Sequence, residues 1–173
     1  MIFITGGCRS GKSTLALELA RKNKGRTAFV ATAVGFDGEM RKRIGDHKKL
    51  RPAGWKTFEE PDDLSGLLSS LPKDFKTVII DCVTIYLTNL LVAKKNIKKI
   101  EEEMAAVIRA IQSSPASYIV VSNEVGAGIV PATGLGRKFR DLAGEVNKQL
   151  ASAADEVYFM VSGIPMKIKN GKN

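Results

Sequence analysis

Residues 6–13 read Gly-Gly-Cys-Arg-Ser-Gly-Lys-Ser, and this short stretch decides the fold. It matches G-x-x-x-x-G-K-[ST], the pattern of a phosphate-binding loop (P-loop) that joins a strand to a helix. The apolar run Ile2–Thr5 precedes it, and a leucine-rich helical pattern follows it. Inward-turned backbone N–H groups and the helix dipole attract phosphate in such a loop. We therefore expect nucleotide contacts from all of its residues: Gly6, Gly7, Cys8, Arg9, Ser10, Gly11, Lys12 and Ser13.

Apolar, β-rich runs recur along the chain with helical patterns between them. The expected strands are Ile2–Thr5, Thr27–Ala31, Thr77–Asp81, Ser117–Ser122 and Glu156–Val161. Apolar residues at helical spacing predict helices near Arg137–Ala154 and Lys98–Gln112. This alternation is typical of an α/β protein with a mostly parallel central sheet. With the P-loop, it predicts a RecA-like P-loop NTPase, a three-layer sandwich formed as a single domain over residues 1–173.

Two residues are candidates for holding Mg²⁺. Ser13 would offer its hydroxyl, while Lys12 would bridge the β- and γ-phosphates of a nucleotide. Val78-Ile79-Ile80-Asp81 is an apolar strand that ends in a carboxylate, and such an acid holds Mg²⁺ or its water in P-loop enzymes. The alternative for Asp81 is an N-cap of the following helix. Cys82 and Cys8 follow strands that are often near neighbours in such folds, and we assign the thiols no catalytic role.

Composition excludes several classes of protein. Hydrophobic residues make up 44% and charged residues 26% of the 173 residues, which is ordinary for a globular protein. The apolar runs are far shorter than the roughly 20 residues that span a bilayer, so no membrane span is expected. No secretory signal is recognisable at the N-terminus, which makes the cytoplasm the expected compartment. Two isolated cysteines make a poor zinc site.

The net charge of +9 is concentrated in one stretch. Between residues 41 and 56, seven basic residues stand against one acid, Asp46: Arg41, Lys42, Arg43, Lys48, Lys49, Arg51 and Lys56. Such a run is either a solvated helix face or an anion-binding surface. A nucleic-acid-binding ATPase would use it for DNA or RNA, with strong salt dependence. Because the chain has no recognisable nucleic-acid motif, we expect a triphosphate there and no nucleic-acid partner.

His47 is the one histidine of the sequence, and it lies inside this basic stretch. A lone histidine on a polar helix is usually a plain surface residue. Here the neighbouring cations would attract a triphosphate to the imidazole, which is a candidate nucleophile. A second segment, Asn123-Glu124-Val125-Gly126, follows the fourth expected strand, where a regulatory GTPase places N-K-x-D. Since the lysine and aspartate are missing, a regulatory GTPase is disfavoured.

Longer blocks of sequence resemble one enzyme family over essentially the whole chain. The blocks are T-G-G-C-R-S-G-K-S at 5–13, A-T-A at 31–33, D-G-E-M-R-K-R-I-G-D-H-K-K-L-R-P-A-G-W-K-T at 37–57, D-C-V-T-I-Y-L-T-N-L-L at 81–91, N-E-V-G-A-G-I-V-P at 123–131, F-R-D-L-A-G-E-V-N-K-Q-L-A at 139–151 and A-D-E-V-Y-F-M-V-S-G-I-P at 154–165. They resemble the bifunctional adenosylcobinamide kinase / adenosylcobinamide-phosphate guanylyltransferases of cobalamin biosynthesis. The later blocks are more specific than the P-loop.

This resemblance implies roles for particular residues. The histidine of R-I-x-x-H-x-x-x-R-P, here His47, is expected to carry GMP covalently. Outside the P-loop, the nucleotide contacts that it implies are Ala31, Thr32, Ala33, Lys48, Lys49, Leu50, Arg51, Glu59 and Asp81. Some relatives carry two adjacent histidines or a glutamate where this chain has Asp46-His47 and Asp81. The segment Thr133–Gly136 is richer in glycine than expected after the N-E-V-G block.

The resemblance also implies the reaction. ATP or GTP would phosphorylate adenosylcobinamide, and GMP would then pass from GTP through His47 to adenosylcobinamide phosphate, releasing pyrophosphate. The expected cofactors are GTP, ATP and Mg²⁺. The expected assembly is a homo-oligomer of three copies, that is, a trimer. The rival enzyme is a P-loop kinase with a single activity toward another small metabolite, in which His47 is a bystander.

Overall fold

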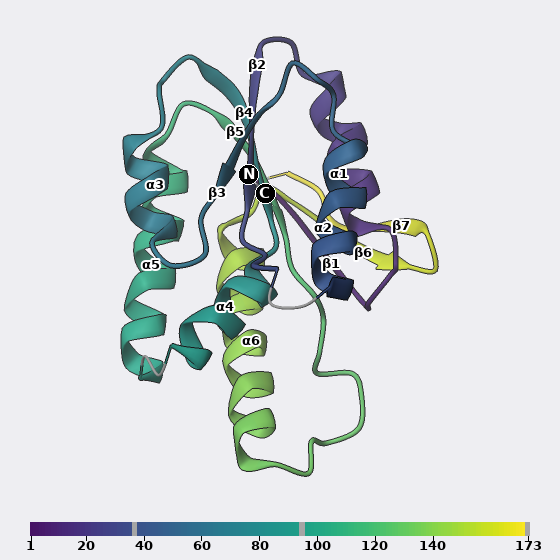
Figure 1. The fold of residues 1–173 in the computed structure, drawn as a ribbon, viewed down its shortest axis with the longest axis vertical. Coiled ribbons are helices and arrows are strands. Elements are labelled where there is room, and N and C mark those ends of the chain that lie inside the picture. Colours follow the sequence, from purple (N-terminus) through teal and green to yellow (C-terminus); the bar gives the residue numbers. More distant parts are fainter. Residues whose placement is uncertain (36–37, 94–95, 172–173) are drawn as a thin grey trace.

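A seven-stranded sheet forms the centre of the computed structural model, which describes residues 1–35, 38–93 and 96–171. Within these ranges the strand order is β3-β2-β4-β5-β1-β6-β7 (Figure 1). The first six strands pair in parallel and β7 pairs antiparallel with β6. Their bounds are β1 Ile2–Gly6, β2 Arg26–Ala31, β3 Lys56–Glu59, β4 Phe75–Asp81, β5 Ser117–Val121, β6 Glu156–Val161 and β7 Ile164–Lys169.

Helices cover both faces of this sheet. They are α1 Lys12–Lys22, α2 Gly38–Lys49, α3 Leu64–Ser70, α4 Val83–Val92, α5 Ile97–Ser113 and α6 Gly134–Ala153. In Figure 1, α1 and α2 lie on one side of the sheet, and α3 to α6 lie on the other. The three layers and the largely parallel sheet confirm the predicted fold class.

The core has two parts because strand side chains alternate between the faces of the sheet. Val78 and Ile80 of β4 point into the larger part, which includes buried residues of α3 to α6. Ile79, between them, points into the smaller part with Leu17 of α1. A strand that is buried on both faces reads as a continuous apolar run, which is why β4 was recognisable in the sequence.

Differences from the predicted elements lie at the edges of the sheet and at helix starts. The strands β3 and β7 were not expected from the sequence, and both are edge strands. Helix α6 begins at Gly134, three residues before the predicted helix, and the Thr133 side chain caps it by accepting a hydrogen bond from Gly136 N at 3.1 Å. The strand β5 lies between β1 and β4, so the strands that precede Cys8 and Cys82 are not adjacent. Both cysteines are free thiols.

The described helices include none that combines the length and the apolar character needed to cross a membrane. Asp37, the first residue of one block quoted above, lies outside the described residues, as does the side chain of Arg43.

Candidate active site

A cavity of about 530 Å³ opens where β1, β2, β4 and β5 end. Ligands of open α/β sheets bind at this edge, because the loops that follow parallel strands converge there. Of the residues predicted from the sequence, these line the cavity: Cys8, Arg9, Ser10, Gly11, Lys12, Ser13, Ala31, Ala33, His47, Arg51 and Asp81. The structure therefore brings the P-loop, the strand-end carboxylate and the histidine into one site.

Two glycines give the P-loop its shape. Gly6 has φ +144°, and a Cβ there would lie 2.5 Å from the Met160 carbonyl oxygen of the adjacent strand β6. Gly11 has φ +94° and is the N-cap of α1, without a side-chain cap. The first N–H groups of α1 are therefore left to a ligand at the helix terminus, which favours an anion.

The Lys12 side chain is buried and bends back over the P-loop. Its ammonium donates to the carbonyl oxygens of Gly6 at 3.0 Å and Gly7 at 2.5 Å, and to Ser10 Oγ at 3.5 Å. These contacts hold the positive charge at the loop, where the phosphates of a bound nucleotide would lie.

Asp81 ends β4 and faces the same cavity. Burial raises the pKa of this carboxyl group, while a side-chain hydrogen bond with Ser13 and the charges of His47 and Arg51 act in the opposite direction. The helix-cap interpretation of Asp81 is wrong, because the N-cap of α4 is Cys82 and no side chain caps that helix. The carboxylate is therefore available to the site.

The oxygen atoms of Ser13 and Asp81 suit Mg²⁺, which prefers oxygen ligands. The described part of the chain holds no cluster of three or more histidine, cysteine or acidic side chains that could form a metal cage. A hydroxyl and one carboxylate in contact fit an ion that takes its remaining ligands from water and nucleotide phosphates.

His47 reaches the cavity from the C-terminal part of α2, and its side chain is half-buried. Close by, the Arg51 guanidinium stacks 3.7 Å above the centre of the Phe29 ring and donates from Nη1 to Thr57 Oγ1 at 3.2 Å. Burial lowers the pKa of Arg51, and the nearby carboxylates of Asp81 and Glu59 oppose that shift. Arg51 Nε is buried and has no hydrogen-bond partner. The arginine is thus held rigidly beside the carboxylate that ends β4.

Other residues predicted as nucleotide contacts lie outside the cavity lining. Lys48 pairs with Glu59 at 2.5 Å, and Lys49 pairs with Asp46 at 3.2 Å. Thr32 is fully buried, and its hydroxyl accepts a hydrogen bond from Cys82 N at 2.9 Å and donates one to Cys82 O at 2.8 Å. Gly6, Gly7 and Leu50 also lie outside the lining, so the contacts of all these residues with a nucleotide stay predictions.

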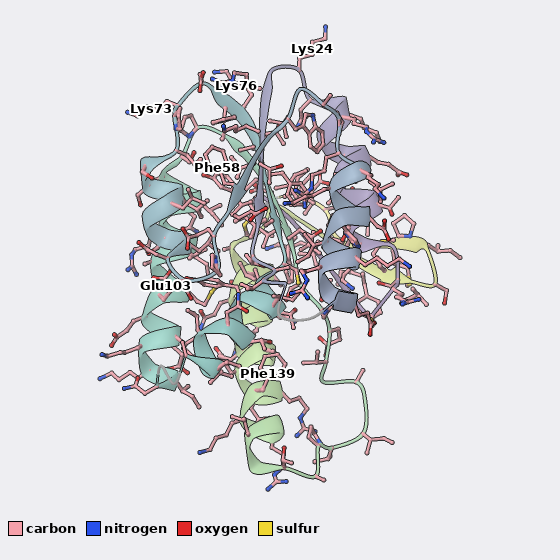
Figure 2. The ribbon with its side chains drawn as sticks, viewed as in Figure 1. Lys24, Phe58, Lys73, Lys76, Glu103 and Phe139 are labelled. Atoms are coloured by element: carbon pink, nitrogen blue, oxygen red, sulfur yellow. The ribbon has the colours of Figure 1, made fainter. Side chains whose placement is uncertain are left out.

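The basic stretch does not face the cavity as a whole. Of its six basic residues with described side chains, Lys42 and Arg51 line the site. Three further lysines lie away from the cavity, at the end of the molecule where β2 and β4 begin: Lys24, Lys73 and Lys76 (Figure 2). The basic side chains described by the structure therefore do not converge on the cavity.

Sequence reasoning missed several residues of the lining: Thr14, Glu39, Lys42, Ile44, Asp46, Cys82, Ile85, Val121 and Asn123. A usable signal existed for Asn123, because it comes two residues after the end of a buried strand. The carboxyl ends of parallel strands meet at one edge of the sheet, so polar residues there are candidates for ligand contacts.

The fold and this site define a P-loop NTPase. A RadB recombinase structure matches with a TM-score of 0.53 at 16% identity, covering 91% of this chain and 73% of that one. An ATPase from the type III secretion system of pathogenic bacteria matches with a TM-score of 0.57 at 12% identity, covering 92% and 51%. At these identities the likeness shows the fold alone.

The chain belongs to the cobinamide kinase / cobinamide phosphate guanyltransferase family, whose model matches residues 2–168. It is 40% identical over 166 residues to the bifunctional adenosylcobalamin biosynthesis protein CobP of Pseudomonas aeruginosa, covering 96% of this chain and 95% of the relative. It is also 41% identical over 181 aligned positions to the bifunctional adenosylcobalamin biosynthesis protein CobU of Escherichia coli, covering 98% and 99%. The predicted family is therefore confirmed.

Proposed function

We propose that this chain catalyses two transfers in cobalamin biosynthesis: phosphorylation of adenosylcobinamide, then transfer of GMP to adenosylcobinamide phosphate. The single observation that carries the proposal is that His47 and the P-loop line one cavity together with Asp81, which interacts with both Ser13 and His47. A kinase alone would use the P-loop and the carboxylate. The histidine in the same cavity supports the second transfer.

In the kinase step, the acceptor hydroxyl oxygen bonds to the γ-phosphorus of ATP or GTP. The bond from that phosphorus to the β–γ bridging oxygen breaks, the nucleoside diphosphate leaves, and the hydroxyl proton passes to solvent. Phosphoryl transfer needs mainly positioning and charge stabilisation. The amides of the P-loop and the Lys12 ammonium supply both, and Ser13 and Asp81 would hold Mg²⁺, which neutralises phosphate charge when bound.

In the guanylyl step, an imidazole nitrogen of His47 bonds to the α-phosphorus of GTP, and pyrophosphate leaves. A phosphate oxygen of adenosylcobinamide phosphate then bonds to the same phosphorus, and the bond to His47 breaks. A loop that grips the distal phosphates suits both reactions, because those phosphates are transferred in one and leave in the other. Arg51 would stabilise charge on the phosphates, and the stacking of its guanidinium on Phe29 supports this role.

The test is covalent labelling of the denatured protein after incubation with GTP radiolabelled at the α-phosphorus. We expect the label on His47, stable in base and released in acid, as a phosphoramidate should be. In His47→Ala and His47→Asn, adduct formation and guanylyl transfer should fall by about three orders of magnitude or more, since nothing replaces the nucleophile.

Two controls accompany this test. GTP labelled at the γ-phosphorus should leave no label on the protein, and the kinase activity of both variants should stay within about tenfold of wild type, because that step does not use the imidazole. Label on another residue, or undiminished guanylyl transfer by His47→Ala, would contradict the assignment and favour a kinase with a single activity.

A further inference from the structure

Asn123 occupies a place in the site that the proposed reactions do not yet use. The sheet order β4-β5-β1 puts the end of β5 between Asp81 and the P-loop. Asn123 is the second residue after β5, and it lines the cavity together with Lys12 and Asp81. A side chain at this position lies between the two groups that would hold the distal phosphates.

The backbone around Asn123 is fixed by three other elements. Its N–H donates to Thr84 Oγ1 of α4 at 2.6 Å, and its carbonyl oxygen accepts from Asn147 Nδ2 of α6 at 3.0 Å. The next residue, Glu124, donates from its N–H to the carbonyl oxygen of Gly6 at 2.9 Å. The position of Asn123 is therefore tied to the P-loop itself.

The side-chain amide of Asn123, in contrast, has no hydrogen bond to any described residue. The other two asparagines near the site use their side-chain nitrogen structurally. Asn89 Nδ2 donates to the Thr32 carbonyl at 2.8 Å, and Asn147 Nδ2 donates to Asn123 as above. An amide that is half-buried on a fixed backbone and faces a cavity is placed to bind a ligand rather than to stabilise the fold.

The geometry of the site also indicates which ligand atoms the side-chain amide of Asn123 would contact. In a P-loop the backbone amides enclose the inner phosphates and the lysine reaches the β- and γ-phosphates. The γ-phosphoryl group then lies beyond the loop, toward the end of the strand that separates β1 from β4. That strand is β5. Beyond its last residue, Val121, the first side chain that lines the cavity is that of Asn123.

We propose that Asn123 Nδ2 donates a hydrogen bond to an oxygen of the γ-phosphoryl group, so that this residue distinguishes nucleoside triphosphates from diphosphates. The inference rests on the proposed nucleotide site and deepens it. In the kinase step the same contact would orient the group being transferred. After transfer the contact is lost, which favours release of the diphosphate.

The experiment compares equilibrium binding of ADP and of a non-hydrolysable imido analogue of ATP to the full chain with Mg²⁺, by calorimetry. Wild type should bind the triphosphate analogue more tightly than ADP. Asn123→Ala should weaken binding of the analogue by about 10- to 100-fold, because it loses a hydrogen bond to a charged group. Binding of ADP should change less than about threefold.

A second variant tests whether weaker binding by Asn123→Ala comes from the lost contact or from a folding defect. Asn123→Asp keeps the shape of the side chain and all three backbone contacts, and its carboxylate should repel the γ-phosphate, so analogue binding should weaken at least as much as in Asn123→Ala. Equal weakening of ADP and analogue in both variants would overturn the inference and indicate a structural role. Unchanged binding of both ligands, or a wild type that does not prefer the triphosphate, would overturn it as well.

These measurements need no corrinoid and no covalent adduct, so their outcome is separate from that of the proposed function. Loss of triphosphate preference in Asn123→Ala would support the inference even if His47 carried no label. Conversely, labelling of His47 with an unchanged triphosphate preference in both variants would leave the proposed function standing and exclude the role of Asn123.

Discussion

At the scale of single residues, Asp81 carries the clearest conflict between stability and function. Burial raises its pKa, so the surroundings disfavour the charged form, yet the proposed site needs that charge. A buried group that stabilises the fold would not be arranged in this way. Such residues are typical of functional sites, where neighbours are placed to hold a charge against desolvation.

Asp81→Asn should therefore separate the two effects. The amide removes a charge that burial disfavours, so the melting temperature should stay equal to wild type or rise slightly. The Mg²⁺ concentration for half-maximal kinase activity should rise by about tenfold or more, because an oxygen ligand or its charge is lost. Thermal melts and a Mg²⁺ titration check this. A lower melting temperature with unchanged Mg²⁺ dependence would assign Asp81 a purely structural role.

Residues of the site differ in how far the sequence predicts them. Lys12 and Asp81 stand in short patterns next to apolar strands, so local sequence was sufficient. Arg51 was predicted through family resemblance, but its stacking on Phe29 is a contact between segments that only the fold brings together. The local sequence places Asn123 at the carboxyl edge of the sheet, but its place between the P-loop and Asp81 follows only from the strand order.

At the scale of elements, one hydroxyl joins three helices on the far side of the sheet from α1, namely α3, α4 and α5. Tyr86 OH, on α4, accepts a hydrogen bond from Leu64 N of α3 at 3.0 Å and donates to Glu103 Oε1 of α5 at 2.7 Å. Glu103, labelled in Figure 2, also accepts from Ser65 N at 3.0 Å and Ser65 Oγ at 2.8 Å. Because α4 begins just after Asp81-Cys82, this network holds the helix that follows the site.

Tyr86→Phe should lower the free energy of unfolding by about 1–3 kcal/mol, since it leaves the Leu64 N–H without its partner in the core and removes one of the two hydrogen bonds to Glu103 Oε1. Urea unfolding measures this. The matched control is Tyr158→Phe, whose hydroxyl bonds Glu156 at 3.0 Å in a less buried setting and should change stability by under about 0.5 kcal/mol. Equal effects of the two substitutions would contradict a special role for the Tyr86 network.

The two strands missed in the sequence share a physical cause. Strand β3 has only four residues, and β7 contains Pro165 and two lysines in six residues. Edge strands pair on one side only, so they tolerate proline and charge and lack the continuous apolar run that marks β4 and β5. The central strands were predictable because both of their faces are buried.

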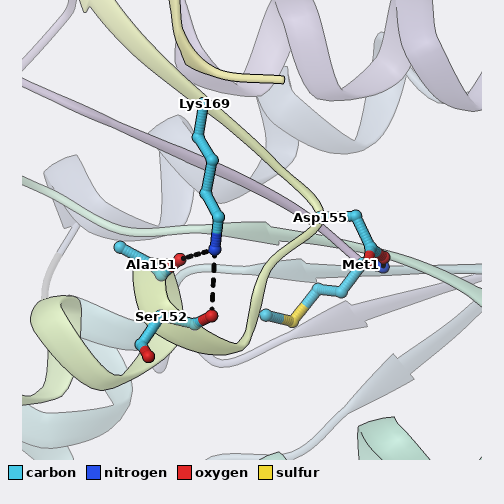
Figure 3. Close-up of polar contacts among 5 residues, drawn as sticks. All are labelled: Met1, Ala151, Ser152, Asp155 and Lys169. Atoms are coloured by element: carbon cyan, nitrogen blue, oxygen red, sulfur yellow. Dashed lines mark hydrogen bonds and ion pairs between the residues drawn. The ribbon is translucent and has the colours of Figure 1, made fainter. Parts of the chain in front are cut away.

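At the scale of the whole molecule, the residue before β1 and the last residue of β7 are both tied to residues 151–155, where α6 ends and the chain leads into β6 (Figure 3). The Met1 ammonium pairs with Asp155 at 2.6 Å. Lys169 Nζ donates to the carbonyl oxygens of Ala151 and Ser152, each at 3.0 Å. These are among the last carbonyls of α6, which the helix itself leaves unsatisfied, so the lysine acts as a C-terminal cap from another element.

Lys169→Met keeps the apolar part of the side chain and removes the cap. We expect a loss of about 1 kcal/mol and a fall in melting temperature of about 2–4 °C. Lys24→Met, at an exposed lysine without a described partner, is the matched control and should leave the melting temperature unchanged. Scanning calorimetry of both variants decides the point, and indistinguishable melts would show that the cap contributes nothing.

The position of β1 in the sheet also has a consequence for biosynthesis on the ribosome. Ile2 pairs with Ile119 of β5 on one side and with Glu156 of β6 on the other. The strand β1 therefore has no partner strand until β5 and β6, which lie much further along the chain, have been made. A nascent chain cannot complete the nucleotide cradle before β5 is made, because Val121 at the end of β5 and Asn123 just beyond it line the cavity. We therefore expect that nascent chains that stop before β5 do not retain GTP or ATP.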